Sequence, residues 1–127
     1  MRVLFVCTGN SFRSPVAEAL TRKYKPHVGV ESAGINPANS IAENARELLK
    51  KECASEYVKP KPEPVTERAV EKADLIVVMS RKHEKYLIDN FKVPKREIRN
   101  WDIKDPINPD IRAEETFEKI KERLKNL

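Results

Sequence analysis

An uninterrupted apolar run, Leu75–Met79, is the feature that most restricts the fold of this chain. A short run without polar alternation is typical of a strand that is buried on both faces, as in a parallel sheet covered by helices. Three further segments have the composition of strands: Arg2–Val6, Val28–Gly34 and Glu97–Trp101. Segments with a helical spacing of apolar residues separate them. This alternation predicts an α/β protein, a single-domain three-layer sandwich in which helices flank a four-stranded parallel sheet.

The helical segments have apolar residues three and four positions apart. They are expected after residue 14, over 41–52, over 66–72 and 80–90, and near the C-terminus, where Ala113, Phe117, Ile120 and Leu124 form one stripe. Thr66 and Ser80 are the residue types that cap a helix N-terminus through their hydroxyl groups. The segment Lys59–Pro64 holds three prolines and cannot be helical. We interpret it as a stiff, extended linker on the surface.

Length and charge restrict the class of protein. The 127 residues suit one domain spanning residues 1–127. No apolar stretch approaches the roughly 18 residues of a membrane span, and no signal-peptide pattern precedes the first strand, so we expect a cytoplasmic protein that binds no membrane. Lys and Arg outnumber Asp and Glu by 25 to 20. The excess is spread out, without the basic stripe of a nucleic-acid-binding protein, so no nucleic-acid partner is expected.

The composition also indicates adaptation to heat. Charged residues make up 35% of the chain, against about 25% in ordinary domains. Glutamine is absent. Both features are common in proteins that work at high temperature, so we expect a thermophilic protein.

A polar loop, residues 7–14, joins the first strand to the first helix and begins with Cys7. Backbone N–H groups and the positive end of the helix dipole converge at such a junction and bind anions. Gly9 and Asn10 tolerate the left-handed backbone angles that turn successive N–H groups inward. Arg13 adds a planar fork of donors that holds two oxygens at once. The sequence therefore predicts a phosphate-binding loop after the first strand.

The same positive surroundings favour the thiolate of Cys7 over the thiol. A thiolate that attacks phosphorus expels an alcohol or phenol, and that leaving oxygen needs a proton. The loop that follows the fourth expected strand supplies two candidate acids, Asp102 and Asp105. Pro106 restricts the backbone of Asp105. From the residues alone, both aspartates remain candidates.

Together these segments resemble the low-molecular-weight protein tyrosine phosphatase family, whose fold is shared with thioredoxin-coupled arsenate reductases. The resemblance covers nearly the whole chain, with landmarks at residues 7–15, Glu31–Gly34, Ala73–Ser80 and Asp105–Pro106. It implies a protein tyrosine phosphatase that needs no metal or cofactor. The substrate implied is a phosphorylated protein or a small phosphomonoester.

The resemblance also implies roles for individual residues. Cys7 would form a phosphocysteine intermediate, Arg13 would stabilise the transition state, and Asp105 would act as the acid and then as the base. The substrate-binding residues implied are Thr8, Gly9, Asn10, Ser11, Phe12 and Ser14. Ser14 would hydrogen-bond the Cys7 sulfur, and Ser32 would support Asn10.

Some positions depart from the family pattern. No aromatic residue occurs in the segment 35–40, and Ile107 and Asn108 follow Pro106 where many relatives have an aromatic residue. A strict preference for phosphotyrosine is therefore not predicted. His27 and His83 lack metal-ligand spacing, and we expect both on the surface.

Two other functions use the same loop. An arsenate reductase needs further thiols, and the segment 81–96 contains none. Cys53 would serve only if it lay near Cys7, and otherwise an external thiol partner would be needed. A phosphocysteine carrier holds phosphate without a hydrolytic acid, and the presence of Arg13 and Asp105 counts against it.

Overall fold

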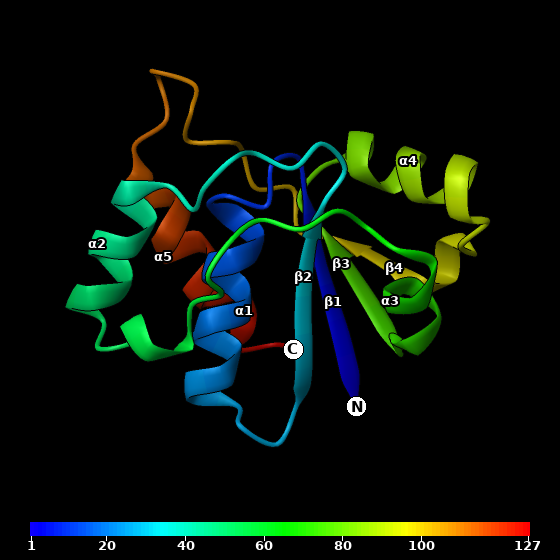
Figure 1. The fold of residues 1–127 in the computed structure, drawn as a ribbon, viewed down its shortest axis with the longest axis horizontal. Coiled ribbons are helices and arrows are strands. Elements are labelled where there is room, and N and C mark those ends of the chain that lie inside the picture. Colours follow the sequence, from blue (N-terminus) through cyan, green and yellow to red (C-terminus); the bar gives the residue numbers. More distant parts are fainter.

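Residues 1–127 are described by the computed structural model, and a four-stranded parallel sheet lies at its centre (Figure 1). The strands are β1 (Arg2–Cys7), β2 (Gly29–Gly34), β3 (Leu75–Val78) and β4 (Ile98–Asn100), in the order β2-β1-β3-β4. The apolar run is one of the two central strands, as predicted. Because all strands are parallel, the loops that follow β1 and β4 leave the same edge of the sheet.

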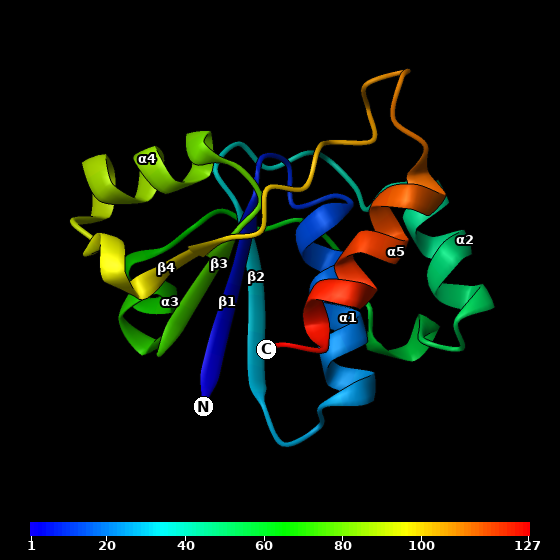
Figure 2. The same cartoon turned by 180° about the vertical axis from the view of Figure 1, so that it is seen from behind.

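Helices cover both faces of the sheet, as Figures 1 and 2 show from opposite sides. On one face lie α1 (Arg13–Tyr24), α2 (Glu43–Lys51) and α5 (Ala113–Leu124), and on the other lie α3 (Glu67–Lys72) and α4 (Arg81–Phe91). Two short 3₁₀ helices, η1 (Ser55–Tyr57) and η2 (Lys95–Glu97), complete the order. The predicted three-layer α/β architecture is confirmed. None of the helices combines the length and the apolar composition that crossing a bilayer requires.

Strand β1 separates two hydrophobic cores. Its side chains alternate, so that Val3, Phe5 and Cys7 join the larger core under α1 and α5, while Leu4 and Val6 join the smaller core under α3 and α4. Such burial on both faces is typical of central parallel strands. The alternation places Cys7, the last residue of β1, on the face that α1 covers.

The two expected helix caps differ. Thr66 precedes α3, and its hydroxyl accepts a hydrogen bond from the Ala69 N–H at 3.1 Å, as predicted. Ser80 precedes α4, but its side chain makes no capping bond, so this prediction was wrong. The Ser80 hydroxyl lies instead 3.1 Å from Nδ1 of His83. The Ser80 hydroxyl therefore binds the side chain of His83 and does not bind a backbone N–H group of the helix.

Candidate functional site

The loop of residues 8–12 between β1 and α1, hereafter the anion loop, lies beside the segment 35–42 that follows β2. Four N–H groups of that segment bind carbonyl oxygens of residues 7–11: Ile35 to Cys7 at 3.1 Å, Asn36 to Thr8 at 2.8 Å, Ala38 to Gly9 at 2.9 Å and Ala42 to Ser11 at 3.0 Å. These four carbonyl groups thus point toward the segment 35–42. The N–H groups of residues 8–12 donate to no group of the protein. They remain free to bind an anion.

The backbone of the anion loop takes its left-handed turn at one residue. Asn10 has a φ of 51°, whereas no glycine of the chain has a positive φ. The expectation that Gly9 shares this conformation was therefore wrong. The close approach of β2 to the anion loop depends on another glycine, Gly34. A Cβ atom at that position would lie 2.7 Å from the Thr8 carbonyl oxygen.

The N-terminus of α1 opens directly onto the anion loop. No side chain caps it, and its first turn contains no acidic residue. The positive end of its dipole is therefore not neutralised by a side chain of its own first turn.

Cys7 lies at the base of the anion loop and is only 2% exposed. Its Sγ lies 2.9 Å from Oγ of Ser14, the contact that the family resemblance implied. The Asn10 side chain donates to Oγ of Ser32 at 2.9 Å, as also implied.

Arg13 and Asp105 meet above the anion loop. Arg13 is buried, and its Nη1 donates to the Ile103 carbonyl oxygen at 2.9 Å. Its Nη2 lies 3.4 Å from Oδ2 of Asp105, whose side chain is 42% exposed. Asp102 is exposed and does not line the cavity above Cys7. Of the two candidate acids, the structure brings only Asp105 to Cys7 and Arg13.

His83 is completely buried, so the prediction of a surface position was wrong. Its Nε2 lies 2.9 Å from Oγ1 of Thr8, and its other ring nitrogen faces Ser80. Burial, with the charges of Arg13 and Lys82, lowers the pKa of His83 to about 3. A neutral ring at physiological pH therefore connects α4 to the anion loop.

The connector, residues 59–64, is mostly exposed, as expected for a surface linker, but it also binds the anion loop. Lys59 is buried, and its ammonium group donates to Oδ1 of Asn10 at 2.7 Å. The Glu63 N–H donates to the same oxygen at 2.9 Å. Its carbonyl accepts a bond from the Gly34 N–H at 2.8 Å. The connector thus packs against the back of the anion loop.

A cavity of about 350 Å³ lies above Cys7. Thr8, Gly9, Ser11, Phe12 and Arg13 contribute to its lining from the anion loop and the start of α1, and Asp105, Pro106 and Ile107 from the loop after β4. Phe12, 6% exposed, is its only aromatic wall. Ile107 stands at the rim and is 85% exposed. The lining has room for a substrate but offers no exposed ring for stacking.

Cys53 lies apart from this cavity. Ala42, which lines the cavity, precedes α2, and Cys53 follows the other end of that helix. A helix of this length spans about 13 Å. Cys53 is exposed, Cys7 is buried, and both are free. No group of three or more His, Cys, Asp or Glu side chains has a metal-binding arrangement.

A family model described as low molecular weight phosphotyrosine protein phosphatase matches residues 2–127. The chain belongs to this family. Among curated members of the family, a protein-arginine-phosphatase of Bacillus subtilis (strain 168) is 37% identical over 98 residues. The match covers 72% of this chain and 63% of that relative, less than two thirds of its length.

Solved structures of family members have the same fold. A low molecular weight protein tyrosine phosphatase from T. tengcongensis is 27% identical, with a TM-score of 0.82 and coverage of 100% of this chain and 99% of that chain. An arginine phosphatase variant with a phosphorylated active-site serine has the same identity and TM-score, with coverage of 100% and 95%.

Proposed function

We propose that this protein is a cysteine-dependent phosphatase that hydrolyses phosphotyrosine or related phosphomonoesters without a metal ion. The observation that carries the proposal is the position of Cys7 beneath free N–H groups, with Arg13 and Asp105 beside it. The N–H groups and the guanidinium bind the phosphoryl oxygens and stabilise the charge of the transition state. The substrate is a phosphorylated protein or a small phosphate monoester.

The reaction has two steps. In the first, the Cys7 thiolate attacks phosphorus, an S–P bond forms, the P–O bond to the leaving group breaks, and Asp105 gives its proton to the leaving oxygen. In the second, Asp105 takes a proton from water, the resulting hydroxide attacks phosphorus, and the S–P bond breaks to release phosphate and the thiolate. The phosphorylated active-site serine of the related arginine phosphatase supports a covalent intermediate at this position.

The test is hydrolysis of p-nitrophenyl phosphate in the presence of EDTA. We expect Cys7→Ser to abolish turnover and Asp105→Asn to reduce kcat by about 10²–10⁴-fold. Asp102→Asn is the matched control, because this aspartate is exposed outside the cavity, and it should keep wild-type activity. Turnover by Cys7→Ser, or an equal loss in both aspartate variants, would contradict the mechanism.

Phosphoarginine in proteins is a second candidate substrate. The relative from Bacillus subtilis is named a protein-arginine-phosphatase, and the cavity has no exposed aromatic ring to stack on a phosphotyrosine. The same assay with a phosphotyrosine peptide and a phosphoarginine peptide separates the candidates by their kcat/KM values.

We further propose that the protein works in the cytoplasm and in a heat-adapted cell. Both cysteines are free, and a reactive thiolate needs reducing surroundings.

An arsenate reductase that uses its own second cysteine is disfavoured, because Cys53 lies beyond the far end of α2.

A further inference from the structure

We infer that Lys59 is a positioning residue that holds the anion loop from behind and, through Asn10 and Ser14, directs a hydrogen bond at the Cys7 sulfur. This inference rests on the proposed function, since it concerns the same thiolate. It assigns a purpose to the connector, a segment that the sequence interpretation treated as a linker.

The surroundings of Lys59 are those of a fixed group. Its side chain is 6% exposed, and its ammonium nitrogen lies 2.7 Å from Asn10 Oδ1, 2.8 Å from the Ser32 carbonyl oxygen and 3.0 Å from Oε1 of Glu63. An ammonium group has three hydrogens, so each one has an acceptor. Lysine is rarely buried without such partners, and two of the three belong to β2 and the anion loop.

These contacts determine the orientation of the Asn10 amide. The oxygen and nitrogen of an amide are told apart by their partners. The Lys59 ammonium and the Glu63 N–H can only donate, so the atom facing them is the oxygen. The Asn10 amide nitrogen must then face the opposite side, where it donates to Oγ of Ser14 at 2.8 Å and Oγ of Ser32 at 2.9 Å. All four positions of the amide are used.

The hydroxyl group of Ser32 has one arrangement, and that of Ser14 has one when Cys7 is a thiolate, which can only accept. Ser32 gives its hydrogen to Oε1 of Glu18 at 2.6 Å, so its oxygen is left to accept from Asn10. Ser14 also accepts from Asn10, and its hydrogen has two acceptors within reach. The Ala33 carbonyl oxygen lies at 3.5 Å, too far for a good bond, while Sγ of Cys7 lies at 2.9 Å.

The hydrogen bonds therefore run in one direction, from Lys59 to Asn10, then to Ser14 and to the sulfur. Each donor polarises the next one, which strengthens the last bond of the chain. A negatively charged sulfur accepts this hydrogen bond from Ser14 more strongly than a neutral thiol does. Lys59 thus stabilises the thiolate from a position outside the cavity above Cys7.

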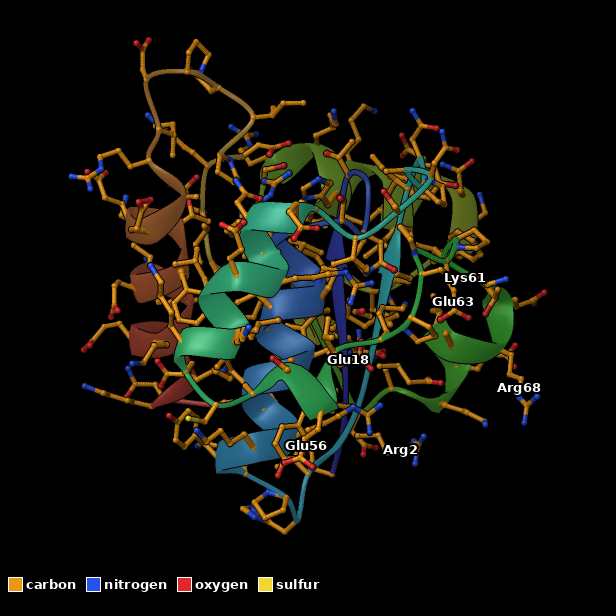
Figure 3. The ribbon with its side chains drawn as sticks, turned by 60° about the vertical axis from the view of Figure 1, so that its left-hand side comes forward. Arg2, Glu18, Glu56, Lys61, Glu63 and Arg68 are labelled. Carbon is orange, nitrogen blue, oxygen red and sulfur yellow. The ribbon has the colours of Figure 1, made fainter.

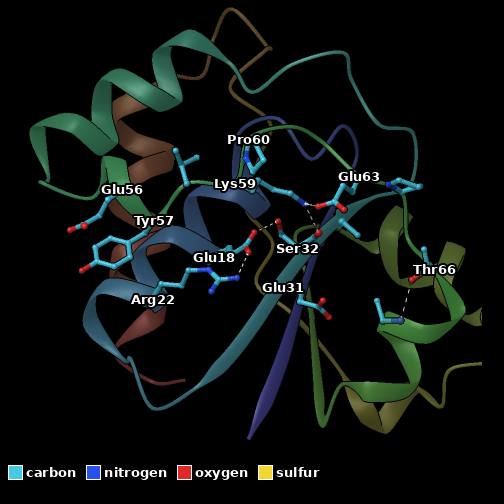
Figure 4. A pocket seen from close by; sticks show the side chains of 14 residues that line it. Glu18, Arg22, Glu31, Ser32, Glu56, Tyr57, Lys59, Pro60, Glu63 and Thr66 are labelled. Carbon is cyan, nitrogen blue, oxygen red and sulfur yellow. Dashed lines mark hydrogen bonds and ion pairs between the residues drawn. The ribbon is translucent and has the colours of Figure 1, made fainter.

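Lys59 is reached from a separate face of the molecule. With Glu18, Ser32 and Glu63 it lines a second cavity of about 530 Å³, drawn in Figure 4, whose lining shares no residue with the cavity above Cys7. Figure 3 shows Glu63 and Lys61 on the connector and Glu18 on the neighbouring helix. A substitution at Lys59 therefore removes none of the residues that line the substrate cavity.

Other charged groups surround this chain of bonds. Glu63 on the connector pairs with Lys59, and Glu18 on α1 pairs with Arg22 at 2.8 Å. Arg13 on α1 and Asp105 on the loop after β4 stand on the substrate side. His83 on α4 stays neutral above about pH 3. The variants below leave all of these groups in place.

The experiment measures the rate at which iodoacetamide alkylates Cys7 as a function of pH, followed by mass spectrometry of the peptide that contains this residue. Lys59→Met keeps the aliphatic stem and removes the charge and the donors. We expect it to move the midpoint of the profile upward by about one pH unit. Lys59→Gln keeps one N–H for Asn10, so its midpoint should lie between the two. Lys61→Met, at an exposed position of the same connector, is the control and should match the wild type.

The possible results separate the inference from the proposed function. An ordinary thiol midpoint near 8.5 in the wild type would reject the proposed catalyst itself. A low wild-type midpoint that Lys59→Gln and Lys59→Met leave unchanged would reject the role of Lys59 alone. An equal shift in Lys61→Met would show a general effect of charge and would also reject it. Circular dichroism identifies a variant that does not fold, and the Lys59→Gln profile then decides.

Discussion

Gly34 shows how a single atom constrains the candidate site, because a Cβ there would approach the Thr8 carbonyl oxygen to 2.7 Å and the Asn10 nitrogen to 2.9 Å. Both neighbours are backbone atoms and cannot rotate away. We therefore expect Gly34→Ala to displace the anion loop, to lower the free energy of unfolding by about 1–3 kcal/mol and to reduce kcat. Urea unfolding and p-nitrophenyl phosphate hydrolysis measure the two effects. Gly29→Ala in the same strand serves as the control, because its Cβ would lie 3.3 Å from the flexible Arg2 side chain and at an ordinary contact distance of 3.6 Å from the Met1 carbonyl oxygen. Equal losses in both variants would contradict this account.

Helix α4 is connected to the anion loop by His83, and this connection has a pH dependence. The pKa of His83 is lowered to about 3 by burial in the folded protein, whereas an unfolded histidine titrates near 6.5. Between these values the unfolded chain binds a proton that the folded one does not, so the free energy of unfolding falls on acidification, by up to about 1.4 kcal/mol per pH unit. We expect His83→Gln to remove this slope in urea unfolding between pH 6.5 and 4.5. His27→Gln, at an exposed position, should keep it; a slope that survives in His83→Gln would show that the histidine is not its source.

Most charged residues of the molecule lie on its surface, around two cores, and only Arg13, Glu18 and Lys59 are buried. Its 25 basic and 20 acidic residues are accompanied by ion pairs such as Lys121 with Glu52 at 3.0 Å, which joins α5 to the end of α2. A high content of charged residues is common in proteins that work at high temperature. We expect a midpoint of thermal unfolding above the range of about 45–65 °C that is usual for mesophilic domains. Differential scanning calorimetry measures it, and a midpoint inside that range would contradict heat adaptation.

Local features of the sequence were sufficient for much of this structure. The apolar run of β3 and the 3.6-residue spacing of the helices predicted the α/β sandwich, because strand and helix periodicity depend on neighbouring residues. Cys7 and Arg13 were found for the same reason, since one short segment places a strand, a polar loop and a helix N-terminus in succession. The family resemblance singled out Asp105, which the residues alone did not separate from Asp102.

Only the tertiary structure decided which distant segments meet behind the anion loop. His83 is 75 positions from Thr8, and Lys59 is 49 positions from Asn10. A lone histidine and a lysine in a proline-rich connector have ordinary surface composition, so no local pattern marks them. Their burial follows from the order of the parallel strands, which brings α4 and the connector against the loop after β1. Sequence periodicity reports which face of an element is apolar, whereas the partner of a buried polar group depends on how the elements pack.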